Sequence, residues 1–259
     1  TQDFKGVVLK NELFGIRQIR EDDQHIWVNA MAGQNWHEFV LHCLTNDWAG
    51  VENLSLIPGT VGAAPMQNIG AYGKEIKEVF EELQALEIAS GQLKTFKKED
   101  CQFGYRESAF KKALKGQYVI TDVTFKLNKT PEFNTSYGAI QQTLDDMGVE
   151  ALSIQAISEA VIRIRQSKLP DPAKIGNSGS FFKNPVIGPI DYEGLKIEYA
   201  DLPGYKLPNG DVKVPAAWLI EKAGWKGKRF GNIGVHKDQP LVLVNYGKGE
   251  GKALEKLSQ

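Results

Sequence analysis

The sequence of 259 residues lacks the features that mark disulfide-rich, membrane-spanning and nucleic-acid-binding proteins. Cys43 and Cys101 are its two cysteines, and their wide separation without a Cys-x-x-Cys motif indicates neither a disulfide framework nor a zinc site. No apolar run approaches the roughly 18 residues of a membrane span, and the N-terminus has no signal-peptide pattern. Charge is balanced at 31 basic and 32 acidic residues, without a basic run that would attract nucleic acid. We therefore expect a cytoplasmic globular protein without a metal site.

Hydrophobic spacing predicts a mixture of strands and helices, enough for one large domain or two small ones. Residues 130–150 lack a clear pattern and are expected to form a loop. One helix is expected to begin with Asn35 as its N-cap. Another is expected to begin at Ser153 and to end near Lys168, before a Leu-Pro-Asp-Pro sequence that suits a domain boundary. Further helices are expected at 215–224 and 251–257, and strands at 7–9, 14–19, 26–30, 79–88, 93–96, 118–125 and 235–244.

The most informative segment runs from Leu54 to Gly73 and places Gly59, Gly62 and Gly70 among small, mostly uncharged residues. Glycine permits positive φ and has no Cβ, so such a backbone can lie close to an anion or a flat ring. The spacing matches neither Gly-x-Gly-x-x-Gly nor a Walker A loop. Tight turns between strands would also explain the glycines, but the lack of charge favours a neutral planar ligand.

Several cationic side chains have both a structural and a functional interpretation. Arg106 stands among aromatic residues just before a predicted strand, where it could hold a planar carboxylate or stack on Tyr105. Arg163, Arg165 and Lys168 suit the negative end of a helix dipole, and they could equally face an anionic substrate.

Histidines and serines give weaker signals. His37 and His42 share a predicted helix without metal spacing, so a structural or solvated role is favoured for both. Ser178 and Ser180 lie in Gly-Asn-Ser-Gly-Ser-Phe-Phe-Lys-Asn-Pro, which reads as a turn. Because the chain has no Gly-x-Ser-x-Gly elbow, acyl transfer is not indicated.

Four separated blocks resemble the UDP-N-acetylenolpyruvoylglucosamine reductase (MurB) family of bacterial flavoenzymes. They are the segment 54–73, Phe-Gly-Tyr-Arg-Glu-Ser at 103–108, Lys-Leu-Pro-Asp-Pro at 168–172, and the segment 176–185, in the family's order. The resemblance implies an α+β fold with a vanillyl-alcohol-oxidase/PCMH-type FAD-binding domain at 1–155 and a smaller α+β substrate-binding domain at 156–259. It also implies bound FAD, NADPH as co-substrate, and reduction of an enolpyruvyl UDP-sugar to UDP-N-acetylmuramate in peptidoglycan synthesis.

The resemblance also assigns roles to individual residues. It implies that Ser180 delivers a proton after hydride addition and that Arg106 stabilises the substrate carboxylate. The implied flavin-binding residues are Ile57, Pro58, Gly59, Gly62, Asn68, Ile69, Gly70, Ala71 and Tyr105. The implied residues around the nucleotide and sugar are Tyr137, Lys168, Asn184, Tyr205 and Lys213, and Tyr137 suggests the subclass with a tyrosine-bearing substrate loop.

The chain departs from the family pattern at both ends. No counterpart of the family's Gly-Ser-Asn loop, which holds the FAD pyrophosphate, precedes Thr1, and no counterpart of its C-terminal catalytic glutamate precedes Gln259. We therefore expect a monomeric reductase of this family that lacks its N-terminal segment and its C-terminal end. Two alternatives stay open: a nucleotide-sugar-binding module without redox activity, which bound flavin would exclude, and a non-catalytic structural fragment.

Overall fold

A computed structural model describes residues 5–259 and divides them into two compact units. The first unit comprises residues 8–165, and the second comprises residues 166–259 together with residues 5–7. The division falls inside one long helix, a little beyond residue 155, where the sequence analysis placed the domain boundary.

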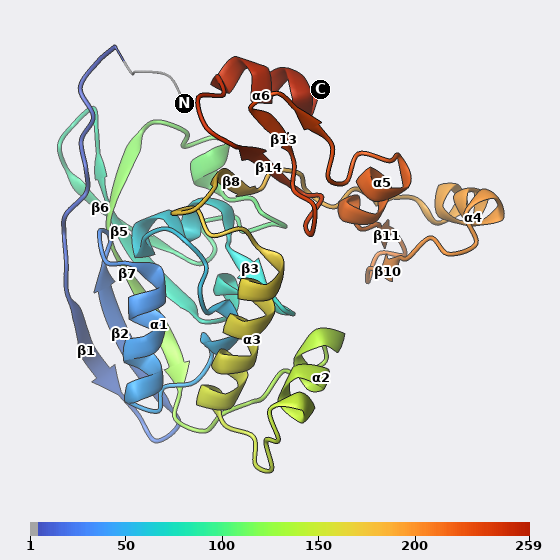
Figure 1. The fold of residues 1–259 in the computed structure, drawn as a ribbon. Helices are drawn as coiled ribbons and strands as arrows, with labels where there is room; N and C mark the ends of the chain where they lie inside the picture. The colour runs from blue at the N-terminus through green and yellow to red at the C-terminus, as the bar shows by residue number, and fades with distance from the viewer. Residues whose placement is uncertain (1–4) are drawn as a thin grey trace. The chain divides into compact units, whose positions relative to one another are not determined.

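The first unit is built on a five-stranded antiparallel sheet with the strand order β1-β2-β7-β5-β6 (Figure 1). Its strands are β1 (Ile16–Glu21), β2 (His25–Met31), β5 (Phe80–Glu87), β6 (Leu93–Lys97) and β7 (Tyr118–Asn128). The β1–β2 and β5–β6 pairs are hairpins, and β7 lies between them and pairs with both. The strands expected at 79–88 and 93–96 are therefore confirmed, and they pair with each other as a hairpin.

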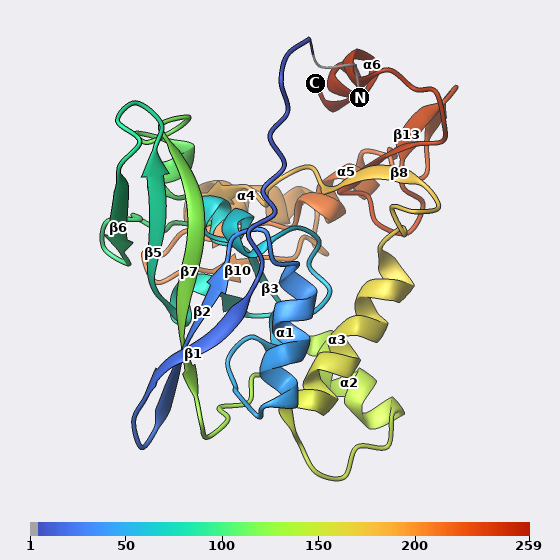
Figure 2. The same ribbon diagram turned by 90° about the vertical axis from the view of Figure 1, so that its left-hand side faces the viewer.

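Helix α1 (Trp36–Thr45) covers one face of this sheet, as Figures 1 and 2 show. Asn35 caps it as predicted, because its side chain accepts hydrogen bonds from two backbone N–H groups of the first turn at 2.9 and 3.1 Å. The inward stripe of α1 and the facing side chains of β2 and β7 form the main core, where the rings of Trp36, Phe39 and Phe125 pack against one another.

Two further helices, α2 (Gly138–Asp146) and α3 (Ile154–Lys168), pack together through a second apolar cluster. The Ser153 hydroxyl accepts a hydrogen bond from a first-turn N–H at 3.0 Å, so Ser153 caps α3 as predicted. The apolar stripe expected along α3 is buried in this cluster.

The second unit carries two small antiparallel sheets, with strand orders β10-β11-β9 and β12-β13-β14-β8. Its elements are β8 (Gly176–Ser180), β9 (Val186–Ile187), α4 (Pro189–Glu198), β10 (Tyr205–Lys206), β11 (Val212–Lys213), α5 (Ala216–Lys222), β12 (Arg229–Phe230), β13 (Ile233–Val235), β14 (Val242–Asn245) and α6 (Gly251–Ser258). A small core of Tyr192, Leu202, Val212 and Val214 holds α4 to the first of these sheets. Helices and antiparallel strands in separate regions give the α+β class that was predicted.

Two expected strands are corrected by the structure. Residues 7–9 form no strand, and their side chains are 75–90% exposed; β-branched residues favour a strand only where neighbours pack against them. The single strand expected at 235–244 is two strands, β13 and β14, because Pro240 interrupts it and proline cannot donate to a sheet.

The loop expected at 130–150 is also corrected, since it contains α2. This helix begins without a side-chain cap and has few apolar residues, so its sequence signal is weak. Hydrogen bonds from Gln141 to Asp145 and from Gln142 to Asp146, both of 2.9 Å, stabilise its exposed face. None of the helices among residues 5–259 has the length and apolar character needed to cross a bilayer.

Candidate functional site

The glycine-rich segment 54–73 folds as a series of tight turns. The 3-10 turns Val61–Ala63 and Pro65–Gln67 follow one another, and β3 (Gly70–Ala71) and β4 (Lys74–Glu75) then form a two-stranded hairpin. Five residues of the segment have a positive φ, namely Leu56, Gly59, Asn68, Tyr72 and Gly73. Three of these five are not glycine, so contacts from the rest of the protein must hold them in place.

The glycines of this segment serve different purposes. A Cβ on Gly62 would lie 2.5 Å from the Cβ of Ala32, and a Cβ on Gly70 would lie 2.7 Å from Nη1 of Arg106. These two glycines therefore allow close packing inside the protein. Gly59 has a φ of +119° and nothing within 4 Å of the position that a Cβ would take. Its backbone is open to an approaching ligand.

The other apolar residues that were predicted to bind flavin are partly built into the core. The side chain of Ile69 is buried there, and Ile57 and Ala71 are half-buried against it. Pro58 is exposed beside Gly59. Among the residues of the segment that were predicted to bind flavin, Pro58 and Gly59 are therefore the exposed ones.

Asn68 is fully buried, and its side chain is committed to contacts within the protein. Its Nδ2 donates to Oε2 of Glu75 and to the carbonyl of Gly104, both at 3.0 Å, and its Oδ1 accepts from the N–H of Lys77 at 3.1 Å. The residue has a φ of +44°, a region that asparagine tolerates better than most residues. Asn68 therefore shapes the segment from inside.

Tyr105 and Arg106 occupy the tip of a tight turn. Gly104 and Glu107 close this turn by exchanging backbone hydrogen bonds of 3.0 and 3.2 Å. Arg106 has a φ of +54°, which costs a non-glycine residue of the order of 1–3 kcal/mol and persists only when the surroundings impose it. The centre of its guanidinium lies 5.2 Å from the Tyr105 ring, so the stacking considered in the sequence analysis is present.

The Arg106 guanidinium connects this turn to the glycine-rich segment. Nη1 donates to the carbonyl of Asn68 at 3.4 Å and to Oε1 of Glu75 at 3.3 Å, and Nη2 donates to the carbonyl of Gly70. The Ser108 hydroxyl adds a 2.7 Å hydrogen bond to another carbonyl of the segment. Two motifs that are more than 30 residues apart in sequence therefore form one constellation.

Four of the remaining predicted residues lie beyond α3, in the second unit. Tyr205 of β10 pairs directly with Lys213 of β11, and opposite residues of an antiparallel pair project to the same face. Asn184 accepts a hydrogen bond from the N–H of Ala216 at 3.0 Å, so its side chain caps α5. Ser180 is the last residue of β8 and is exposed.

The remaining two substrate-site predictions are Tyr137 and Lys168. Tyr137 directly precedes α2, and its ring lies 5.5 Å from the ring of Tyr72 at an interplanar angle of 85°. Lys168 is the exposed last residue of α3 and belongs to the second unit. Arg106 belongs to the first unit and Ser180 to the second, so the two predicted catalytic side chains come from different units.

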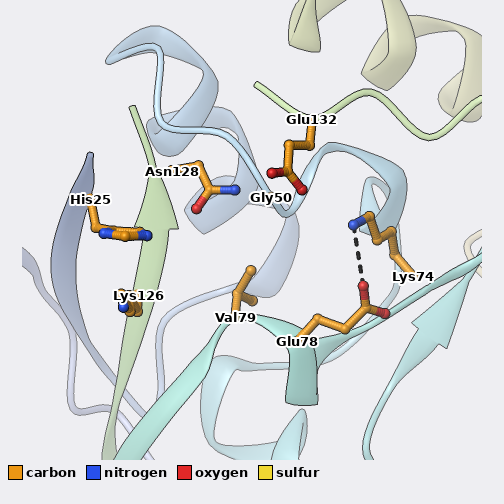
Figure 3. A pocket seen from close by; sticks show the side chains of 8 residues that line it. All are labelled: His25, Gly50, Lys74, Glu78, Val79, Lys126, Asn128 and Glu132. Atoms are coloured by element: carbon orange, nitrogen blue, oxygen red, sulfur yellow. Dashed lines mark hydrogen bonds and ion pairs between the residues drawn. The ribbon is translucent and has the colours of Figure 1, made fainter. Parts of the chain in front are cut away.

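A separate polar cavity of about 270 Å³ lies in the first unit (Figure 3). It is lined by His25, Gly50, Lys74, Glu78, Val79, Lys126, Asn128 and Glu132. Lys74 and Glu78 form a 3.2 Å ion pair at its wall. The cavity lies below the roughly 300–1,000 Å³ typical of pockets for drug-sized ligands and is lined by none of the predicted site residues. We therefore do not assign a dinucleotide cofactor to it.

The cysteines offer no reactive group or metal ligand. Both are buried and free, and burial raises the pKa of each thiol, to about 12 for Cys101 and further for Cys43. Within residues 5–259, no group of three or more His, Cys, Asp or Glu side chains is placed to hold a metal ion.

Known proteins match the chain along its whole length. Residues 1–97 match the family described as FAD binding domain, and residues 171–259 match the C-terminal domain of UDP-N-acetylenolpyruvoylglucosamine reductase. A UDP-N-acetylenolpyruvoylglucosamine reductase of Amoebophilus asiaticus is 58% identical over 258 residues, which cover 100% of this chain and 76% of the relative. The chain belongs to the UDP-N-acetylenolpyruvoylglucosamine reductase family. The resemblance seen in four sequence blocks is thereby confirmed.

Two further matches agree with this membership. The reductase of the same name from Flavobacterium johnsoniae is 49% identical over 260 residues, which cover 100% of this chain and 77% of the relative. The crystal structure of the reductase from Thermus caldophilus matches with a TM-score of 0.60 at 22% identity, over 88% of this chain and 65% of that one. At that identity the structural match supports the fold alone.

The residues of the glycine-rich segment fit a flavin. Asn53, which directly precedes the segment, is fully buried, and its Nδ2 donates to the carbonyls of Tyr72 (3.1 Å) and Asn134 (2.9 Å). Its Oδ1 has no partner among the described residues, and an unsatisfied buried acceptor costs about 1–3 kcal/mol. A flavin ring carries an N–H donor of the kind that this oxygen lacks. An open backbone at Gly59 and an unused acceptor at Asn53, six residues earlier in the chain, are therefore two features that suit a flavin.

Sequence reasoning missed several residues that complete this constellation. Glu75 binds both Asn68 and Arg106, but it lies 31 residues from Arg106 and follows the uncharged segment without a motif of its own. Arg165 was expected either to cap α3 or to face an anion, whereas its Nε donates to the carbonyl of Leu56 at 3.2 Å. No local sequence signal predicts either contact, because both join segments that are distant along the chain.

Proposed function

We propose that this protein is a flavin-dependent reductase that converts UDP-N-acetylglucosamine enolpyruvate to UDP-N-acetylmuramate with NADPH, in peptidoglycan synthesis. The observation that carries the proposal is family membership along the whole chain, with one relative 58% identical over 258 residues. The match to an FAD-binding domain covers the glycine-rich segment. A binding module without redox chemistry would not explain that match.

Bound FAD supplies a centre that accepts hydride from NADPH and passes it to the vinyl carbon of the substrate. The backbone at Pro58 and Gly59 binds and orients that cofactor in our proposal, because these are the exposed residues among those predicted to bind flavin and nothing lies within 4 Å of a Cβ at Gly59. Gly62, Asn68 and Gly70 support binding indirectly, since their contacts with the rest of the protein hold the segment in shape. Preorganisation of this kind lowers the entropy lost on binding.

Arg106 holds the substrate carboxylate in this proposal. A guanidinium has five N–H donors, and the described contacts of Arg106 use Nη1 twice and Nη2 once. The Nε–H and the second Nη2 hydrogen remain, and this edge can bind a carboxylate with two parallel hydrogen bonds. The bonds to the glycine-rich segment would then fix the guanidinium in position before negative charge develops on the substrate.

Ser180 supplies the proton in this proposal. Hydride addition at the vinyl carbon leaves carbanion character on the neighbouring α-carbon, which takes a proton from the serine hydroxyl; the serine then regains a proton from solvent. A positioned acid typically contributes about 10²–10⁴-fold to rate. Asn177 stabilises the backbone at the end of β8, next to Ser180, because its Oδ1 accepts a hydrogen bond from the N–H of Gly179 at 3.0 Å.

The proposal is tested by mixing FAD-loaded protein with NADPH and the enolpyruvyl UDP-sugar. We expect NADPH oxidation that depends on the sugar and a product heavier by two hydrogens. Ser178→Ala, on the same strand, is the matched control for Ser180→Ala and should keep normal turnover. Sugar binding without any NADPH oxidation by flavin-loaded protein would contradict the reductase and support the binding module.

We also propose that the protein is a cytoplasmic monomer. Its contacts with the nucleotide and sugar are, in this proposal, Tyr137, Lys168, Asn184, Tyr205 and Lys213. Two free, buried cysteines support a reducing compartment. The direct pairing of Tyr205 with Lys213 supports a shared role for these two side chains. Sedimentation equilibrium tests whether the protein is a monomer. The KM for the sugar in the variant Tyr205→Ala tests the proposed substrate contacts.

A further inference from the structure

Leu56 is the one bulky aliphatic residue with a left-handed backbone in the glycine-rich segment, with a φ of +57°. It lies three residues before Gly59, the glycine of the segment with nothing within 4 Å of the position that a Cβ would take. A leucine in this region costs roughly 1–2 kcal/mol. Something outside the segment must therefore hold its backbone in this conformation.

Side chains from two helices hold the two polar groups of Leu56. The Leu56 N–H donates to Nδ1 of His37, on α1, at 3.0 Å. The Leu56 carbonyl accepts from Nε of Arg165, on α3, at 3.2 Å. We call this arrangement of His37, Leu56 and Arg165 the Leu56 clamp. It holds the two peptide groups that flank the Leu56 Cα, one by its N–H and the other by its C=O, just before the backbone proposed to bind flavin.

The His37 half of the clamp works in one protonation state only. Nδ1 can accept from the Leu56 N–H when the imidazole is neutral with its proton on Nε2, and it cannot accept once it is protonated. Two charged groups face this ring: Arg165 opposes protonation, and Glu38 on α1 favours it. Burial together with the Arg165 charge keeps the pKa of His37 below its usual value of 6.5.

The Arg165 half of the clamp extends toward the predicted substrate loop. Its guanidinium also lies close enough to Tyr72 to lower the pKa of that hydroxyl, although burial has the larger effect and raises the pKa of Tyr72 while lowering that of Arg165. The Tyr72 ring packs in turn against Tyr137. Arg165 therefore connects the flavin-binding segment with the loop that carries Tyr137.

We propose that His37 and Arg165 are positioning residues that together hold Leu56, and with it the turn at Gly59, in the conformation that binds flavin. They hold this conformation only while His37 is neutral. This inference rests on the proposed function, because it concerns the same flavin site. It makes flavin affinity depend on pH through a side chain that does not touch the reacting atoms.

The direction of the pH effect follows from proton linkage. Protonation of His37 competes with the clamp, so flavin affinity is highest above the pKa of His37 and falls as the pH drops below it. With one competing proton, the dissociation constant for FAD rises by about tenfold per pH unit in that range. The same group contributes to folding stability fully above pH about 6.5, and this contribution is lost as the pH falls toward the lower pKa of the folded state.

FAD titrations of the purified protein between pH 5 and pH 8 test the proposal. His37→Asn offers a carbonyl oxygen in the place of Nδ1 that does not titrate, so we expect near-normal affinity at pH 8 and no loss on acidification. His37→Leu removes the acceptor, and we expect an affinity about tenfold weaker at every pH. His42→Asn, an exposed position on the same helix, is the control and should keep the parental pH profile. An unchanged pH profile in His37→Asn overturns the proposal.

The second half of the clamp has its own matched pair. Arg165→Leu removes the donor to the Leu56 carbonyl, and we expect FAD affinity at pH 8 to fall about tenfold. Arg163→Leu, on the exposed face of the same helix, breaks an ion pair with Glu159 and should leave affinity unchanged. Equal losses in the two variants overturn the assignment of Arg165.

The nuclear magnetic resonance signal of the Leu56 amide separates this inference from the proposed function. In flavin-free protein its ¹H shift should titrate together with the His37 ring, and this titration should disappear in His37→Asn. If the parent binds no FAD at any pH, the proposed flavin site fails, while the amide titration still decides whether the clamp exists. An amide shift that does not change with pH refutes the clamp whatever the flavin result.

Discussion

Replacing Asn68 by alanine should be among the most damaging single changes in the glycine-rich segment. The side chain is fully buried and makes three hydrogen bonds, to the carboxylate of Glu75, the carbonyl of Gly104 and the N–H of Lys77. Alanine removes all three bonds from groups that are only partly accessible to water. It also places a residue without a polar side chain in a left-handed backbone.

The magnitude follows from these contacts. Each bond to a neutral backbone group contributes about 1 kcal/mol, and the bond to the Glu75 carboxylate contributes about 2 kcal/mol. The left-handed backbone adds about 1 kcal/mol for alanine but nothing for glycine. We therefore expect the free energy of unfolding to fall by about 5 kcal/mol in Asn68→Ala and by about 4 kcal/mol in Asn68→Gly.

Urea unfolding followed by tryptophan fluorescence measures both losses, and an FAD titration of the same samples reports on the site. Gln67→Ala, at the exposed neighbouring position, is the control and should change stability by less than about 0.5 kcal/mol. A loss below about 1 kcal/mol in Asn68→Ala would refute the view that this side chain holds the segment together. Equal losses in the alanine and glycine variants would refute the backbone contribution.

Three other predictions concern packing, reactivity and chemistry. Gly62→Ala should destabilise the protein by about 1–3 kcal/mol in the same urea assay, because the new Cβ would lie 2.5 Å from the Cβ of Ala32; wild-type stability would contradict that contact. Cys43 and Cys101 should resist thiol-labelling reagents in the folded protein at pH 8 and react in urea, since both thiols are buried with raised pKa; rapid labelling of the native protein would be inconsistent with their burial. Ser180→Ala should leave flavin reduction by NADPH intact and reduce turnover by about 10²-fold or more; unchanged turnover would exclude the serine as proton donor.

The elements that could be predicted from sequence are those specified by neighbouring residues. Asn35 and Ser153 cap their helices as expected, because capping depends on residues within one turn. The hairpin at 79–96 forms as expected, because its two strands are adjacent in sequence. The family resemblance, in turn, depends on short ordered motifs that are visible in the sequence itself.

The elements that could not be predicted depend on contacts between distant residues. The constellation of Asn68, Glu75 and Arg106 joins two motifs, and neither motif specifies the other. The Leu56 clamp needs side chains from two helices that are more than 100 residues apart along the chain. A single sequence gives the candidate residues, but the pairing among them is decided by the fold.

The most direct test of the central claim is the visible spectrum of the FAD-loaded protein in an anaerobic cell. We expect NADPH to bleach the flavin band, and we expect later addition of UDP-N-acetylglucosamine enolpyruvate to restore it in proportion to the sugar added. Loss of the band with NADPH but no recovery with the sugar would contradict the proposed reaction. Failure to retain any flavin after desalting would contradict the assignment of the glycine-rich segment as the cofactor site.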